Sequence, residues 1–188
     1  MEITIIGTGN MGKAIGHNLE MGNDVTYVDS THPATSFGNI VVLAVPYGAL
    51  DSIVDQYGDQ LVGKVVIDIT NPLNFDTWDE LQVPADSSAA AELQAKLPNS
   101  KVLKAFNTNF AGTLSSGKVG DTTTTVLIAG DDDAAKKSLA TALEASPLQT
   151  MDAGSLKRAR EMEAVGFLQM KLAASKQISW NGGFGINK

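Results

Sequence analysis

The chain has 188 residues, 43% of them hydrophobic, which is enough to bury a sizeable core in one globular unit. Its formal net charge of -7 at pH 7 argues against nucleic acid or an anionic membrane surface as the main partner, because no basic patch compensates for the carboxylates. With no cysteine and only two histidines, His17 and His32, the composition excludes disulfides, thiolate ligands, a cysteine nucleophile and a histidine-rich metal site. We therefore expect no metal.

The start of the chain shows no basic region followed by a long apolar stretch, so no signal peptide is predicted. No apolar run approaches the ~20 residues that a membrane span needs. We expect a cytoplasmic protein whose partners include neither nucleic acid nor membrane.

Apolar strand patterns alternate with helical patterns along most of the chain. Several strands are continuous runs of Val and Ile, which is typical of strands buried on both faces. This alternation predicts an α/β fold, a Rossmann-like, doubly wound, mostly parallel sheet with helices on both faces. The predicted strands lie near 2–6, 24–28, 40–45, 64–69, 101–107, 123–129 and 147–151, and the helices near 10–22, 47–57, 88–97, 132–145 and 155–177.

The connection after the second strand is unusually short. Ten residues, Ser30 to Asn39, separate it from the third strand, whereas a full crossover takes about a dozen or more. We predict that the sheet is shortened here and that a helix and strand are absent or reduced to one turn. The longest predicted loops, 70–87 and 108–121, are expected at the carboxyl edge of the sheet, where ligands of open α/β folds bind.

The stretch GTGNMG at 7–12 matches GxGxxG between the first strand and the first helix. Glycines in this motif permit a tight turn, close approach of a pyrophosphate, and close helix packing, while the helix N-terminus directs free N–H groups at the anion. The alternative is a tight turn without a ligand. The predicted contacts are Gly7, Thr8, Gly9, Asn10, Met11 and Gly12. Residues 1–188 are accordingly predicted to form a single dinucleotide-binding domain, in which 154–188 are a C-terminal helix and tail.

Asp29 ends the second strand, 22 residues after Gly7, where an acidic residue binds the ribose hydroxyls of adenosine and favours NAD. Ser30, Thr31 and His32 follow it directly. They are expected to hydrogen-bond a 2′-phosphate if Asp29 points away, or to form a polar turn with no ligand role.

Other polar groups have simpler interpretations. Ser88 and the aspartates 131–133 precede helices and are interpreted as helix caps. Asp68 is expected to be a hydrogen-bonded structural residue, with a perturbed buried carboxylate as the alternative. Glu161 and Glu163 are expected to contribute to solvation or ion pairs.

Several short motifs occur in order along nearly the whole chain. On these motifs the chain resembles the coenzyme F420-dependent NADP oxidoreductase family, whose Rossmann domain is similar to that of membrane-bound metalloreductases. The motifs are GTGNMG at 7–12, VVLAVPY at 41–47, NPL at 71–73, KAFNT at 104–108, AGDDD at 129–133, and DAGSL with Arg160 at 152–160.

The resemblance implies that the protein binds NADP(H) and passes a hydride between its nicotinamide and a flavin or deazaflavin. It places the pyrophosphate at Thr8 to Gly12 and the 2′-phosphate near Ser30 to His32. Asp29 and Thr31 stand where the family commonly has a serine followed by an arginine, so the usual cation for that phosphate is missing. The resemblance also implies cofactor contacts at Ala44, Val45, Pro46, Asn71, Pro72, Phe106, Asn107 and Thr108.

The leading interpretation is an NAD(P)H-dependent oxidoreductase that transfers a hydride to a flavin, a deazaflavin or another planar small-molecule acceptor. Family resemblance favours NADP(H), and Asp29 favours NAD(H). The alternative is a non-catalytic dinucleotide-binding module that senses redox state or regulates a partner. A dehydrogenase for a small hydroxy or keto compound is disfavoured, because no positioned Lys, His or Tyr is evident and no catalytic residue is assigned.

Two segments carry open alternatives. The stretch from Asn74 to Asp86, with Phe75 and Trp78, is expected to be a substrate wall or ordinary packing. The closing stretch Trp180 to Gly185 resembles the family's glycine-containing C-terminal segment. It is expected either to fold back beside the active site or to form a subunit contact, as in a homodimer.

Overall fold

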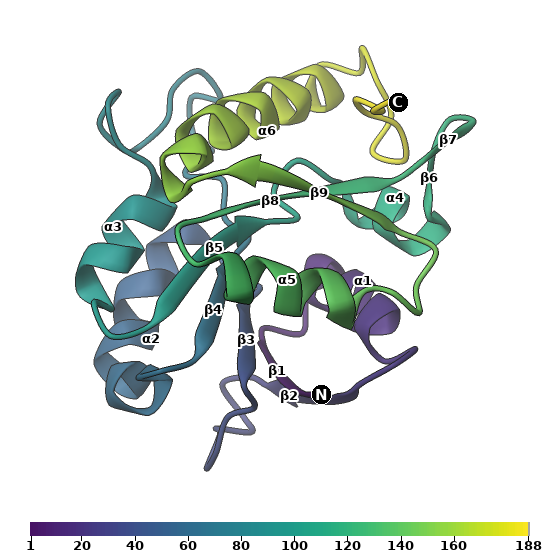
Figure 1. Ribbon diagram of the computed structural model, residues 1–188. Coiled ribbons are helices and arrows are strands. Elements are labelled where there is room, and N and C mark those ends of the chain that lie inside the picture. The colour runs from purple at the N-terminus through teal and green to yellow at the C-terminus, as the bar shows by residue number, and fades with distance from the viewer. Residues whose placement is uncertain (188) are drawn as a thin grey trace.

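The computed structural model describes residues 1–187 and shows one sheet with helices on both faces (Figure 1). The strands of the main sheet are β1 (Glu2–Ile6), β2 (Asp24–Val28), β3 (Ile40–Leu43), β4 (Val65–Asp68), β5 (Lys101–Ala105), β8 (Thr125–Gly130) and β9 (Gln149–Gly154). The helices are α1 (Asn10–Leu19), α2 (Leu50–Tyr57), α3 (Ala89–Lys96), α4 (Ala111–Ser116), α5 (Asp133–Ala142) and α6 (Ala159–Ala174). A small ribbon adds β6 (Lys118–Val119) and β7 (Thr122–Thr123).

The seven strands lie in the order β2-β1-β3-β4-β5-β8-β9. The first five are parallel, which confirms the mostly parallel, Rossmann-like sheet. β8 runs antiparallel to β5, and β9 is parallel to β8, so these two strands run against the rest. Periodicity predicts that a strand exists but not its direction. The sequence therefore did not predict the reversal of β8 and β9.

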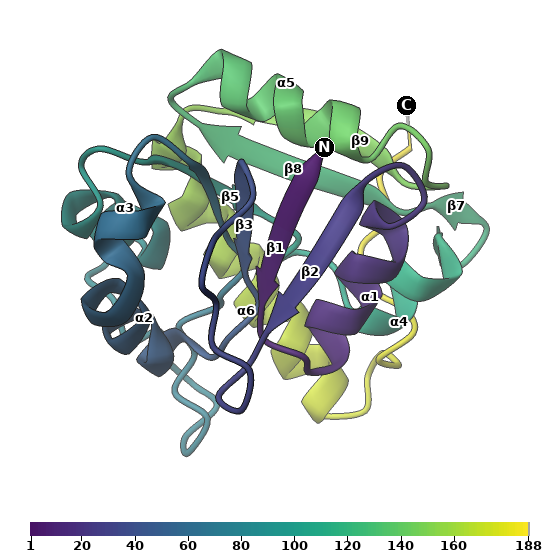
Figure 2. The same cartoon turned by 90° about the horizontal axis from the view of Figure 1, so that it is seen from below.

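Two hydrophobic clusters cover the two faces of the sheet. Neighbouring residues of one strand serve opposite clusters, because successive side chains alternate: Val42 packs with Ile15 of α1, and Val41 packs with Leu50 of α2. All four residues of β3 are buried. The continuous apolar runs in the sequence thus reflect burial on both faces of the sheet, each of which is covered by helices (Figures 1 and 2).

The short connection after β2 is confirmed, because residues 29–39 contain neither helix nor strand. The chain passes the start of β1 at Gly38, whose N–H donates to Thr4 Oγ1 at 2.9 Å. A Cβ at Gly38 would collide with the backbone of Glu2, so only glycine permits this approach. β3 then pairs with β1 on the side opposite β2 (Figure 2).

The predicted loops require one correction. The stretch 108–121 was expected to be a loop but contains α4 and β6, and the register of β6 with β7 extends this ribbon to Thr123. α4 has six residues, which is too short for helical periodicity to be recognised. None of the helices in residues 1–187 has the length and hydropathy that a membrane crossing requires.

Candidate functional site

The turn from β1 to α1 brings three chain segments into close contact. Gly7 adopts φ +111°, and a Cβ there would collide with the carbonyl oxygen of Ala44 after β3. A Cβ at Gly12 would collide with the carbonyl oxygen of Gly7. Gly9 differs, because a Cβ built there meets nothing within 4 Å. Two of the glycines therefore serve packing, while Gly9 leaves open space above the turn.

The first turn of α1 presents its amides to that space. Gly9 is the N-cap and no side chain caps the helix. The bond from Lys13 N to Gly9 O, at 2.9 Å, is the first backbone bond of the helix. Free N–H groups at a helix start, together with the helix dipole, suit a diphosphate without a basic side chain. The glycine turn thus fits the pyrophosphate of a dinucleotide.

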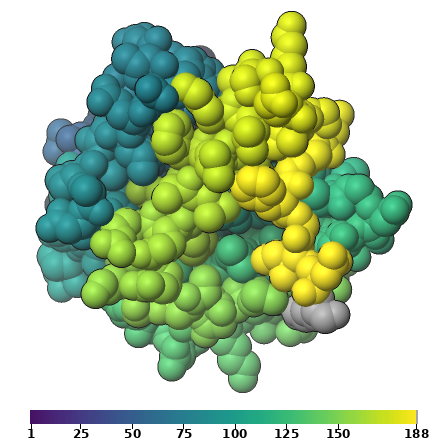
Figure 3. Space-filling view, turned by 90° about the horizontal axis from the view of Figure 1, so that it is seen from above, coloured from purple at the N-terminus to yellow at the C-terminus, as the bar shows by residue number. Residues whose placement is uncertain are grey.

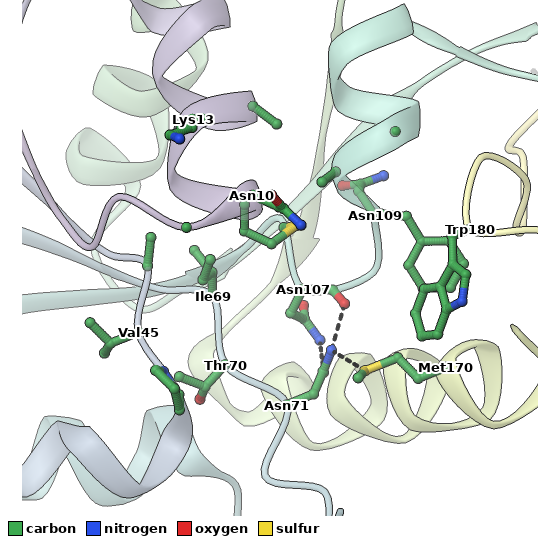
Figure 4. A pocket seen from close by; sticks show the side chains of 18 of the residues that line it. Asn10, Lys13, Val45, Ile69, Thr70, Asn71, Asn107, Asn109, Met170 and Trp180 are labelled. Atoms are coloured by element: carbon green, nitrogen blue, oxygen red, sulfur yellow. Dashed lines mark hydrogen bonds between the residues drawn. The ribbon is translucent and has the colours of Figure 1, made fainter. Parts of the chain in front are cut away.

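A cavity of about 910 Å³ begins at this turn and runs along the carboxyl edge of the parallel strands (Figure 4). Its volume lies at the upper end of the ~300–1,000 Å³ typical of small-molecule sites. The lining residues come from the glycine turn and α1, from residues 44–47 after β3, from the segments that follow β4 and β5, from α4 and α6, and from the C-terminal tail. They are Gly9, Asn10, Met11, Lys13, Ala14, Ala44, Val45, Pro46, Tyr47, Ile69, Thr70, Asn71, Phe75, Asn107, Asn109, Phe110, Ala111, Gly112, Ser115, Met170, Trp180 and Asn181.

The residues proposed from the sequence divide into two groups. Eight of them line the cavity: Gly9, Asn10, Met11, Ala44, Val45, Pro46, Asn71 and Asn107. Outside its lining are Gly7, Thr8, Gly12, Asp29, Ser30, Thr31, His32, Pro72, Phe106 and Thr108.

Physical reasons account for part of the second group. Gly7 and Gly12 pack against backbone, Gly7 against the Ala44 carbonyl and Gly12 against the Gly7 carbonyl. Phe106 is fully buried in the core cluster at φ +63° and carries the chain around the end of β5. Thr108 is buried, and its carbonyl accepts a bond from Gln169 Nε2 at 3.1 Å.

An amide pair, Asn71 and Asn107, lies in the lining of the cavity. Asn71 Nδ2 donates to the carbonyl of Asn107 at 2.8 Å, and Asn107 Nδ2 donates back to Asn71 Oδ1 at 2.8 Å (Figure 4). Asn107 also donates to the carbonyl of Met162 at 3.0 Å, and Asn71 lies 3.5 Å from Met170 Sδ. The carbonyl partners fix which end of each amide is nitrogen, because a carbonyl only accepts. The pair is thus held in one orientation between β4, β5 and α6.

A buried ion cluster lies behind this pair. Lys104 Nζ is 2.7 Å from Asp68 Oδ2 and 2.7 Å from Glu163 Oε1, and all three residues are fully buried. Lys104 also donates to the Thr70 carbonyl at 2.6 Å, while the Thr70 N–H donates to Asp68 Oδ1 at 2.8 Å. Both backbone groups of Thr70 are therefore tied to the cluster, next to Asn71.

Glu163 connects the cluster to α3. Its carboxylate accepts bonds from Ala89 N at 3.0 Å and Ala90 N at 3.4 Å. Burial raises the pKa of Glu163. The structural role expected for Asp68 is confirmed. Of the two roles expected for Glu163, solvation or ion pairing, the structure shows the ion pair. Lys104 and Thr70 were not singled out in the sequence.

The loop after β2 is organised by Asp29. Its Oδ1 accepts bonds from Thr31 N at 2.9 Å, Thr31 Oγ1 at 2.7 Å and His32 N at 2.9 Å. His32 Nδ1 lies 3.1 Å away. The side-chain bond from Thr31 is the largest cause that lowers the pKa of Asp29, to about 2. One carboxylate oxygen thus holds the turn expected to face the adenosine ribose.

The C-terminal tail folds back against the cavity. Trp180 and Asn181 line it, and the Trp180 ring lies 4.9 Å from the Phe110 ring, centroid to centroid. Seen from above, α6 and the tail share one face of the molecule (Figure 3). The structure shows the first of the two alternatives, folding back, beside the cavity, and the subunit contact stays a prediction. A lone Trp in a polar, glycine-rich tail was the available sequence signal.

Comparisons with known proteins identify relatives of this chain. The family model described as NADP oxidoreductase, coenzyme F420-dependent, matches residues 19–72. The F420-dependent NADP reductase of Methanocaldococcus jannaschii is 31% identical over 135 residues, 70% of this chain and 60% of that protein. Metalloreductase STEAP3 of Rattus norvegicus is 29% identical over 185 residues, 87% of this chain and 36% of that protein. This chain thus spans less than two thirds of both curated relatives.

Solved structures extend the likeness to the whole chain. A crystal structure from Arthrobacter sp. FB24, described as an F420-dependent NADP-reductase, superposes with a TM-score of 0.85 at 25% identity and covers 100% of both chains. An imine reductase from Bacillus cereus has a TM-score of 0.66 at 17% identity, covering 95% of this chain and 62% of that one. The second likeness shows the fold alone.

Proposed function

Because this chain belongs to the coenzyme F420-dependent NADP oxidoreductase family, we propose that it binds NADP(H) along the cavity and transfers a hydride between the nicotinamide and a planar acceptor, either a flavin, a deazaflavin or a related ring. The observation that carries the proposal is the uncapped start of α1 beneath the open space at Gly9, in a cavity whose lining also includes the Asn71–Asn107 amide pair.

In this proposal the protein binds the dinucleotide, orients its nicotinamide ring and shields that ring from water. The first-turn amides of α1 neutralise the diphosphate, and Ala44 to Pro46 contact the middle of the dinucleotide. The Asn71–Asn107 pair borders the nicotinamide, where its rigid orientation limits how the ring sits. The bound nicotinamide supplies the hydride chemistry, and the protein contributes proximity and a partly dry environment.

This transfer depends on proximity more than on an acid or base, and among the described residues that line the cavity only Lys13 and Tyr47 have ionisable side chains. Lys13 is on α1 beside the glycine turn. Tyr47 donates its hydroxyl to Glu92 Oε2 at 2.8 Å, and burial together with this bond raises the pKa of Tyr47 to about 12. Reduction of a small ketone, which benefits from a positioned acid, is therefore less well supported than hydride transfer between rings.

In this proposal, residues of the loop after β2 determine the preference between NADP and NAD. The Thr31 and His32 side chains are exposed there, but the Thr31 hydroxyl donates to Asp29 and His32 Nδ1 lies 3.1 Å from it, so the Thr31 hydroxyl can donate to a 2′-phosphate only if its bond to Asp29 opens. Asp29 opposes such a phosphate by its charge. The family favours NADP(H). We propose NADP(H) as the cofactor, with NAD(H) accepted because the arginine common in the family is missing.

The proposed reaction is tested by stopped-flow absorbance at the reduced-nicotinamide band, with flavins, a deazaflavin and quinones offered as acceptors. We expect oxidation of NADPH by at least one planar acceptor, and loss of that rate in Gly9→Ala. Tight NADPH binding without oxidation by any acceptor would overturn the enzymatic proposal.

A non-catalytic redox-sensing module is the second candidate. The observation that favours it is that, among the described lining residues, only Lys13 and Tyr47 are ionisable, and the Tyr47 hydroxyl already donates to Glu92. Calorimetry with NADPH and NADP⁺ separates the two. Different conformations with the two cofactors and no turnover would favour sensing, whereas turnover with a planar acceptor would rule it out.

A further inference from the structure

The buried ion cluster of Lys104, Asp68 and Glu163 contacts the cavity lining through Thr70. All three charged residues are 0% exposed. Thr70 lines the cavity (Figure 4), donates its N–H to Asp68 and accepts a bond from Lys104 at its carbonyl. Replacing a whole buried ion cluster by apolar residues is often neutral or stabilising in proteins, so stability alone does not explain why charges lie here.

The cluster contains one negative charge in excess, because two carboxylates face a single ammonium group. Every partner of the Glu163 carboxylate is a donor, namely Lys104 and the backbone N–H groups of Ala89 and Ala90. This is the environment of an ionised carboxylate, even though burial raises the pKa of Glu163. Among residues 1–187, no further cation forms an ion pair with either carboxylate, so the excess charge is not neutralised.

The field of this charge reaches the cavity. Burial and the bond to Glu92 are the main causes that raise the pKa of Tyr47, a lining residue, to about 12, and the charge of Glu163 contributes. Asn107 of the amide pair donates to the carbonyl of Met162, one residue before Glu163. A charge that is fully buried is screened far less by solvent and salt than a surface charge, so it acts on a ligand held behind the lining.

The nicotinamide ring changes its charge in the proposed reaction. When NADPH donates a hydride, its neutral ring becomes a cation, and the planar acceptor takes the hydrogen together with both bonding electrons. We propose that the Lys104–Asp68–Glu163 cluster favours the oxidised ring over the reduced ring through its excess negative charge, and so makes bound NADPH a stronger hydride donor. This inference rests on the proposed function and specifies how the protein tunes that same site.

Glu163→Gln tests the proposal, because it removes one negative charge with little change in volume. Calorimetry with NADP⁺ and NADPH gives the ratio of the two dissociation constants. The two ligands carry the same phosphates, so the ratio isolates the charge of the ring, and a general loosening of the site would weaken both. We expect the preference for NADP⁺ relative to NADPH to fall roughly fivefold in Glu163→Gln, the size expected for unit charges about 10 Å apart in a protein.

Glu161→Gln is the matched control. Glu161 lies on the same helix and loses the same charge, but its side chain is 42% exposed and pairs with Arg160. Its charge is therefore screened, and we expect the wild-type ratio. If Glu163→Gln does not fold, Asp68→Asn removes the same charge from the other side of Lys104, and the same shift is expected.

The outcomes separate this inference from the function on which it rests. An unchanged ratio in a folded Glu163→Gln or Asp68→Asn protein, or an equal shift in Glu161→Gln, would overturn the inference. Wild-type protein that binds neither dinucleotide would overturn the proposed function and the inference with it. The expected shift in a protein that reduces no planar acceptor would overturn the proposed reaction and leave the electrostatic role of the cluster standing.

Discussion

Lys104 of β5 and Glu163 of α6 form a fully buried ion pair at 2.7 Å, and Asp68 of β4 completes the cluster from the other side of the ammonium group. One cation thus faces two carboxylates at the point where β4, β5, α3 and α6 meet. The cluster also holds both backbone groups of Thr70, so fold stability and the geometry of the cavity depend on the same three side chains.

Replacement of Lys104 by methionine tests this dependence. Lys104→Met leaves two buried carboxylates without their cation, and we expect a loss of about 3–5 kcal/mol in the free energy of unfolding. Glu163→Gln keeps the Lys104–Asp68 pair and should cost less, because burial already disfavours the charged form of Glu163. Denaturant unfolding followed by circular dichroism measures both.

The control for these variants is Lys96→Met. Lys96 pairs with Asp51 on the surface, with both side chains well exposed, and such pairs contribute about 0–1 kcal/mol. A Lys104→Met protein that unfolds at the same denaturant concentration as Lys96→Met would contradict a structural role for the cluster.

Gly166 of α6 offers a way to move Asn71 without removing it. A Cβ at Gly166 would collide with the Asn71 side-chain amide. Because that amide is the end of a side chain and alanine favours helix, we expect Gly166→Ala to fold, with a loss of about 1–3 kcal/mol from the two broken hydrogen bonds between Asn71 and Asn107. Asn71 should leave its pairing with Asn107, and the NADPH affinity should fall roughly tenfold.

The readout for Gly166→Ala is a comparison of two ligands. NADPH reaches the amide pair in the proposed site, whereas 2′,5′-ADP lacks the nicotinamide. Calorimetry should therefore show weaker binding of NADPH with unchanged binding of 2′,5′-ADP. An equal loss for both ligands would place the effect outside the nicotinamide end.

Tyr47 gives a pH-dependent signature of the cavity wall. Burial and the bond to Glu92 raise its pKa to about 12 from the ordinary 10.0, so the folded protein holds this proton more tightly than the unfolded chain does. The resulting stabilisation is fully present below about pH 10 and is lost as the pH rises towards 12. Ultraviolet titration of tyrosinate should show earlier ionisation in Glu92→Gln, and Tyr47→Phe identifies the signal. Superimposable curves for wild type and Glu92→Gln would refute the assignment.

Asp29 is expected to control cofactor preference. Asp29→Ser removes the negative charge next to the proposed 2′-phosphate position, and we expect the ratio of NADPH to NADH affinity to rise roughly tenfold. Asp29→Arg should raise it further by restoring a cation. Calorimetric titration of both cofactors gives the ratio, and an unchanged ratio would mean that the carboxylate does not face the ribose.

Much of the fold could be predicted because its signals are local. The Val- and Ile-rich runs identified β1, β3 and β4, and the glycine motif identified the turn into α1. The ten-residue gap after β2 was too short for a crossover helix, and the structure has none there. The direction of β8 and β9 could not be predicted, because the residue pattern of a strand does not indicate whether it pairs parallel or antiparallel with its neighbour.

Part of the site could also be predicted from local signals in the sequence. Gly9, Asn71 and Asn107 stand at strand ends that converge in any sheet of this type. The ion cluster of Lys104 could not be predicted, because Lys104 is a charged residue within a mostly apolar strand and only tertiary packing brings it to Asp68 and Glu163. The position of Trp180 in the cavity lining depends on Gln169 of α6, which bonds both to Thr108 and to the tail at Phe184, and the sequence does not reveal such a tertiary contact.

The central claim is that main-chain amides at the start of α1 bind a dinucleotide diphosphate over Gly9. Calorimetric measurement of NADPH affinity in Gly9→Ala tests it most directly, because a Cβ there touches nothing in the protein and the fold should survive. Gly58→Ala, where a new Cβ makes ordinary contacts far from the glycine turn, is the control. We expect NADPH affinity to fall at least roughly tenfold in Gly9→Ala alone. An unchanged affinity in a folded Gly9→Ala protein would place the dinucleotide elsewhere and contradict the account.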